Sequence, residues 1–167
     1  FVGAKYYANI LGIKWFCENV IPLLEPNIHL WIVGKGMEVL EDELASDVIH
    51  VVGTVDLLAG YYKYADTVIA PIFDGAGMKV KTAEALSYGK CFVGTAESEI
   101  GYMEYCPDDC KGIFLECNTD KEFASTLNSL KDSGVQKEYQ QIRSFFKDNY
   151  SLQAIENKLG NTLNELR

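Results

Sequence analysis

The 167-residue sequence lacks any long run of basic residues, and no apolar run approaches the roughly 18–20 residues that a membrane-spanning helix needs. Its net charge is −9, and an acidic surface repels phosphate backbones, so we expect no nucleic-acid partner. No signal-peptide pattern opens the chain, which favours a cytoplasmic protein. The hydrophobic fraction of 48% and the charged fraction of 23% are ordinary for a globular domain and argue against disorder.

Cysteine occurs five times but never as Cys-x-x-Cys, and no histidine follows at a zinc-binding spacing. Cys106 and Cys110 leave a zinc half-site or a disulfide open, although no second ligand pair accompanies them. Reduced thiols in a cytoplasmic protein are the simpler expectation, with Cys17 and Cys91 acting as small core hydrophobes. We therefore predict no metal site and no cofactor.

Short β-branched apolar runs alternate with segments of helical periodicity along the first two thirds of the chain. Strands are expected at residues 28–33, 48–52, 67–70, 91–94 and 112–115. Helices are expected at residues 8–24, 37–45, 57–65, 80–88, 121–131, 135–149 and 152–166. Nearly continuous apolar strands are typical of a parallel sheet covered on both faces, and the alternation is typical of right-handed βαβ units. We predict a single α/β domain over residues 1–167, a Rossmann-like three-layer sandwich with a mainly parallel central sheet and C-terminal helices.

Glycine-rich turns follow three of these strands, and the richest one spans residues 71–79 before the helix expected at Val80. Ligands of open α/β sheets bind beyond the carboxyl ends of the strands, where helix N-termini attract anions. Lys81 and Glu84 share one side of that helix, which suits a nucleoside diphosphate: charge for the phosphates and an acceptor for a ribose diol. The alternative for this pair is a surface ion pair. Neither a dinucleotide fingerprint nor a Walker motif is present.

Residues 74–90, DGAGMKVKTAEALSYGK, resemble the donor-site motif of the group 1 glycosyltransferases, which have the GT-B fold. That motif consists of a glycine-rich loop, a Glu in a Glu-Ala-Leu/Met segment, and a glycine before the next strand. Further similarity to this family, in the same order, occurs at residues 29–36, 48–56, 61–71 and 91–95. The resemblance covers about residues 1–117, and the helical tail is compatible with it.

The resemblance implies the C-terminal, donor-binding domain of a glycosyltransferase. Joined to an N-terminal acceptor domain, it would transfer a sugar from a nucleotide-diphosphate sugar to a glycan or lipid-linked saccharide, with retention favoured. The sequence begins as if within a strand, so we expect that the N-terminal domain is missing and that the isolated fragment is inactive. Peripheral membrane association of the full-length protein is left open.

Site residues follow from the resemblance position by position. Lys81 and Glu84 would be catalytic, with Glu84 on the nucleotide ribose and Lys81 beside the donor phosphates. The substrate-binding residues would be Gly3, Asn9, Gly34, Thr54, Val55, Asp74, Gly75, Ala76, Gly77, Met78 and Lys79. Ala76 departs from the family, because many members have there an acid that is linked to the donor sugar. The usual Arg and Lys pair of the first turn is also not recognisable.

Two other classes of protein stay open at this point. A GT-B-fold nucleotide-sugar epimerase would need catalytic acid and histidine residues, but His29 and His50 both lie in apolar strands. A regulatory, receiver-like α/β domain would need clustered acids at a strand end, whereas Asp66 and Asp74 flank one strand. A degenerate transferase domain that serves only as an assembly partner is a further alternative, which Ala76 keeps open.

Overall fold

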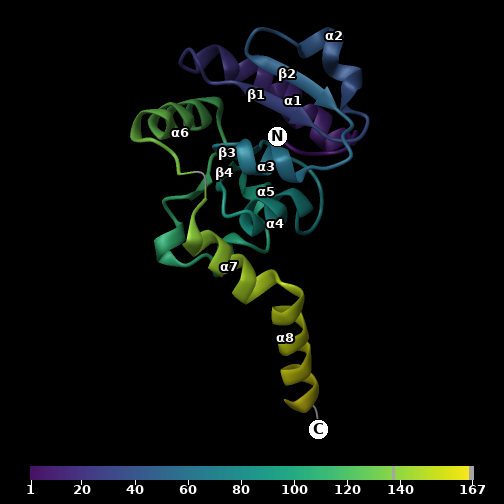
Figure 1. Cartoon of the computed structure of the whole chain (residues 1–167), viewed down its shortest axis with the longest axis vertical. Coiled ribbons are helices and arrows are strands. Elements are labelled where there is room, and N and C mark those ends of the chain that lie inside the picture. The colour runs from purple at the N-terminus through teal and green to yellow at the C-terminus, as the bar shows by residue number, and fades with distance from the viewer. Residues whose placement is uncertain (137, 166–167) are drawn as a thin grey trace.

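The structure is a computed structural model that describes residues 1–136 and 138–165. Its strands are β1 (Leu30–Val33), β2 (Ile49–Gly53), β3 (Thr67–Ala70), β4 (Cys91–Gly94) and β5 (Phe114–Glu116). They form two parallel sheets, β1-β2 and β3-β4-β5, and Val2 pairs with Val33 at the edge of the first. The predicted α/β architecture with parallel strands is confirmed (Figure 1).

The longer helices are α1 (Tyr7–Asn19), α3 (Ala59–Tyr64), α4 (Val80–Ser87), α6 (Asp120–Ser133), α7 (Gln140–Tyr150) and α8 (Leu152–Glu165). The short ones are η1 (Ile21–Leu23), η2 (Met37–Leu40), α2 (Glu41–Leu44), α5 (Ala96–Glu99), η3 (Met103–Tyr105) and η4 (Asp108–Cys110). The C-terminal helices are confirmed, and α8 extends away from the α/β body (Figure 1). The end of the predicted helix 152–166 lies outside the described residues.

Three predicted helices either differ from the structure by more than two residues at one end or are divided. The helix expected over residues 8–24 ends at Asn19, because Pro22 has no N–H for the helical ladder and starts a separate 3₁₀ turn. The helix expected from Val135 begins only at Gln140, because the Tyr139 N–H donates to the Gly89 carbonyl and Tyr139 is extended. Residue 137, within the predicted helix, lies outside the described residues. The segment 37–45 forms a 3₁₀ turn followed by a single α-turn rather than one helix.

Part of the hydrophobic core lies between α1 and α6. Ile13 and Phe16 of α1 are fully buried, and the Phe16 ring meets Phe123 of α6 edge-on at 5.6 Å between centroids. Gly12 of α1 packs so closely that an added Cβ would lie 1.8 Å from the Pro71 carbonyl oxygen. This contact fixes the start of the glycine-rich loop that follows β3. Within the described residues, no helix is long and apolar enough to cross a membrane.

Candidate functional site

Helix α4 begins directly after the glycine-rich loop, with Lys79 as its extended N-terminal flanking residue. Ala85 and Leu86 are fully buried, which explains why this segment docks as a helix against the core. Gly89 ends it at φ +63°, a backbone conformation in which any Cβ would also approach the Tyr139 carbonyl oxygen within 2.8 Å. No side chain caps the N-terminus of α4, and the Thr82 N–H donates to the Lys79 carbonyl, so the N–H groups of Val80 and Lys81 are the ones that an anion could meet there.

Lys81 is the half-buried cation of this site. Its Nζ donates to Oδ1 of Asn9 and lies 4.8 Å from the centroid of the Phe1 ring. The Asn9 amide in turn donates to the Ala4 carbonyl at 2.8 Å, which fixes its orientation. Burial and, to a smaller extent, the neighbouring Lys79 lower the pKa of Lys81, Glu84 partly opposes them, and the resulting pKa is about 8. The structure thus brings together Asn9 and Lys81, two predicted site residues that are far apart in the sequence.

Glu84 lies one turn further along α4 and is hydrogen-bonded from a different element. Oε2 of Glu84 accepts the hydroxyl of Tyr62 at 2.8 Å, and the Tyr62 side chain is only 1% exposed. Lys81 and Glu84 both lie in the described part of the chain, and no direct ion pair joins them there. The surface ion pair considered from the sequence is therefore wrong, because each side chain has its own partner.

The glycine-rich loop reaches α4 through two residues with positive φ, Gly75 at +136° and Gly77 at +67°. Lys79 Nζ donates to the Gly77 carbonyl and to Oε1 of Glu97, each at 2.7 Å. Much of the Lys79 charge is therefore balanced by Glu97, and Lys81 is the cation less compensated by a carboxylate contact. The Asp74 carboxylate accepts from the Gly75 N–H at 2.8 Å and so shapes the loop locally.

The segment after β4 contacts the glycine-rich loop and the first turn of α4. Thr82 donates through its hydroxyl to the Ser98 carbonyl at 2.7 Å, and the Tyr102 hydroxyl donates to the Lys79 carbonyl at 3.0 Å. Met78 rests against Gly101, where an added Cβ would lie 2.6 Å from the Met78 Cγ. The loop and the N-terminus of α4 are thus held in one arrangement by residues that sequence reasoning did not assign to the site.

The turns that follow β1 and β2 hold a second group of predicted site residues. Gly34 has φ +141°, and an added Cβ would lie 2.2 Å from the Gly3 carbonyl oxygen, so the two predicted glycines are in contact. The Thr54 hydroxyl accepts the Gly36 N–H at 3.0 Å and donates to Glu38, while the Thr54 N–H donates to Glu38 Oε2 at 3.1 Å. Val55 is half-buried beside them. The Glu38 partner was missed, because nothing in the pattern links it to Thr54.

A cavity of about 890 Å³ lies elsewhere, between β1 and β3 at the amino ends of these strands. The residues that line it include Trp31, Tyr61, Thr67 and His29. His29 and His50 hydrogen-bond to each other at 3.0 Å there, away from the glycine-rich turns, which gives no support to an epimerase site. The carboxyl ends of the strands are therefore the better candidate site, because the turns, the uncapped helix and Lys81 meet there.

The remaining candidates from the sequence are the acids that flank β3, the cysteines and a metal site. Asp66 precedes β3 and Asp74 follows it, so the two acids lie at opposite ends of the strand and form no receiver-like cluster. The five cysteines, all within the described residues, are free. Among residues 1–136 and 138–165, no group of three or more His, Cys, Asp or Glu side chains is arranged to hold a metal ion.

Comparison with known proteins agrees with this picture. The family model described as "Glycosyl transferases group 1" matches residues 1–133. Crystal structures of Anabaena HepE, in complex with UDP and with UDP and glucose, give TM-scores of 0.74 and 0.72 at 15% and 16% identity. Each match covers 98% of this chain and 48% of the HepE chain, so this chain spans about half the length of that protein.

Two further structures share the fold. Sucrose-phosphate synthase from Thermosynechococcus elongatus has a TM-score of 0.72 at 18% identity, over 99% of this chain and 45% of its own. The catalytic domain of cholesterol-α-glucosyltransferase from Helicobacter pylori has a TM-score of 0.60 at 15% identity, over 90% of this chain and 96% of its own. No curated protein sequence matches the chain. With the family model covering most of its length and this fold in common, the chain belongs to the group 1 glycosyl transferases.

Proposed function

We propose that this domain binds the nucleoside diphosphate of a sugar donor at the N-terminus of α4 and forms the donor half of a glycosyltransferase. The observation that supports it most is the position of Lys81: a half-buried cation, oriented by Asn9, one residue into an uncapped helix. A diphosphate there would interact with Lys81 and with the N–H groups of Gly77 and Met78. Glu84 would accept hydrogen bonds from the ribose hydroxyls through the oxygen that Tyr62 does not occupy.

The chemistry we propose is transfer of the sugar from the diphosphate to an acceptor hydroxyl, with retention at the anomeric carbon. The bond between that carbon and the diphosphate oxygen breaks, a bond to the acceptor oxygen forms on the same face of the sugar, and the acceptor proton passes to the departing diphosphate, on which negative charge develops. Lys81 and the amides at the start of α4 would stabilise this charge, which is electrostatic preorganisation at a developing anion. In this proposal cations and amides supply what a metal would otherwise provide, so no cofactor is required.

The acceptor would bind on an N-terminal domain of the same polypeptide, across a cleft from α4. The residues that this chain contributes all bind the donor, which is why we expect the chain alone to bind nucleotide without transferring sugar. A cytoplasmic location, where nucleotide-sugar donors are available, is consistent with the five free cysteines. Peripheral association of the whole protein with a membrane is part of this proposal.

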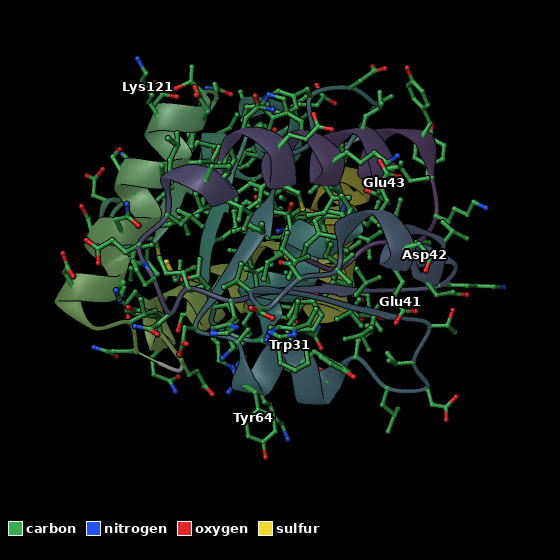
Figure 2. All side chains as sticks on the ribbon, turned by 90° about the horizontal axis from the view of Figure 1, so that it is seen from above. Trp31, Glu41, Asp42, Glu43, Tyr64 and Lys121 are labelled. Carbon is green, nitrogen blue, oxygen red and sulfur yellow. The ribbon has the colours of Figure 1, made fainter. Side chains whose placement is uncertain are left out.

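Calorimetric titration of the 167-residue chain with UDP and GDP tests the proposal. We expect weak binding of at least one of them, reduced about tenfold or more by Lys81→Ala and by Glu84→Ala, because hydrogen bonds to charged groups contribute about 1.5–3 kcal/mol each. Lys121→Ala is the matched control: Lys121 is exposed and points into solvent from α6 (Figure 2). Equal binding by all four proteins would contradict the proposed site.

A further inference from the structure

Tyr62 is an unusual residue for a short surface helix. It lies in α3, six residues long, yet its side chain is 1% exposed and its hydroxyl reaches Glu84 Oε2 at 2.8 Å. Its ring stacks on Tyr88 with 4.9 Å between centroids and 6° between planes, so the position of the phenol is fixed by the core on one side. A buried hydroxyl needs a hydrogen-bond partner, and this one is satisfied by a side chain of the candidate site.

The direction of this hydrogen bond is set by electrostatics. Burial raises the pKa of Tyr62 far above its ordinary value, and the charge of Glu84 raises it further. Both effects favour the protonated phenol, which donates its hydrogen to the Glu84 carboxylate. Since one carboxylate oxygen is fixed in this way, the plane of the group is fixed too, and the remaining acceptor positions have a defined direction.

We propose that Tyr62 is a positioning residue that holds the Glu84 carboxylate for a ribose diol, and so gives the site its preference for ribonucleotides over deoxyribonucleotides. This inference rests on the proposed function, because it concerns the same glutamate. Glu84 on α4 is otherwise free to change rotamer, and ordering a side chain of its length on binding would weaken the complex. The hydrogen bond from a rigid, buried phenol removes that cost before the ligand arrives.

A purely structural role for Tyr62 makes a different prediction. If the ring only fills the core, Tyr62→Phe keeps the stack on Tyr88 and leaves a folded protein in which every nucleotide binds as before. If the hydroxyl positions Glu84, the same variant loses affinity only for ligands that have the hydroxyls. The ratio of two affinities, for a ligand with the diol and one without it, separates the two roles.

The experiment compares UDP with 2′,3′-dideoxy-UDP by calorimetry. The wild-type chain should prefer UDP, and Tyr62→Phe should reduce that preference about three- to tenfold while leaving the affinity for dideoxy-UDP unchanged. Tyr88→Phe is the matched control, because it removes a hydroxyl from the other ring of the same stack. A folded Tyr62→Phe protein with an unchanged preference overturns the inference; no binding of UDP by the wild-type chain instead overturns the proposed function.

A measurement on the wild-type chain covers the case in which Tyr62→Phe does not fold. The hydroxyl proton of a buried, hydrogen-bonded tyrosine exchanges slowly and is observable by NMR in protein labelled at tyrosine. We expect the Tyr62 signal to shift when UDP is added and to stay in place with dideoxy-UDP. Binding of UDP without any change in this signal would contradict a positioning role.

Discussion

Glu99, the last residue of α5, is buried with no partner for its charge. Its side chain is 2% exposed, and neither carboxylate oxygen accepts a hydrogen bond. Burial and, to a smaller extent, the negative charge of Glu116 raise the pKa of Glu99 to about 8. The carboxyl group is thus largely neutral in the folded protein at pH 7 but ionised in the unfolded chain.

The sign of the effect on stability follows from these two states. Because the folded pKa is the higher one, the folded protein binds more protons between pH 4.5 and 8, and the free energy of unfolding falls as pH rises across this window. At about 1.4 kcal/mol for each pKa unit, the loss is on the order of 4 kcal/mol by pH 8. A domain of this size has roughly 5–15 kcal/mol in total, so the effect is large.

Glu99→Gln replaces the titrating group with a neutral one of nearly the same shape. We expect similar stability to wild type near pH 4.5 and a gain of a few kcal/mol at pH 8, measured by urea unfolding followed by circular dichroism. Glu104→Gln, which removes an exposed carboxylate in the same segment, should leave the pH dependence as it is. If the curves of Glu99→Gln and wild type run parallel from pH 4.5 to 8, Glu99 does not titrate as the structure implies.

Two other changes have outcomes that the structure fixes. Gly12→Ala should lower the free energy of unfolding by more than about 2 kcal/mol in urea titrations, because its Cβ would meet the Pro71 carbonyl oxygen at 1.8 Å. Gly60→Ala is the control and should not destabilise the protein, because an added Cβ there has nothing within 4 Å. Comparable losses of stability in the two variants would refute this packing. Affinity for UDP should fall as pH rises through about 8, where the free Lys81 side chain loses its charge, and Lys81→Ala should flatten that part of the profile. A wild-type profile with the same slope as the variant would show that Lys81 does not contact the phosphates.

The strands were predictable because the signal for them is local. The bounds of β3 and β4, Thr67–Ala70 and Cys91–Gly94, match the apolar runs at both ends, since residues of a two-sided parallel sheet must nearly all be apolar. Helix ends were less predictable where a distant residue decides them. The start of α7 depends on the hydrogen bond from Tyr139 to Gly89, which no periodicity contains.

In the candidate site, too, local patterns were predictable and contacts between distant residues were not. Periodicity placed Lys81 and Glu84 on one side of α4, but it did not give their partners, Asn9 and Tyr62, which come from other elements. Glu97, which balances Lys79, was missed for the same reason. Sequence patterns show which face a residue occupies, whereas side-chain pairs across the fold depend on the packing of whole elements.

A crystal of this chain soaked with UDP would reveal whether a nucleoside diphosphate binds at the start of α4 with its ribose on Glu84. We expect phosphate oxygens within hydrogen-bonding distance of Lys81 Nζ and the loop amides, and ribose hydroxyls on the Glu84 carboxylate beside Tyr62. Nucleotide bound only in the cavity between β1 and β3, or a ribose turned away from Glu84, would contradict it.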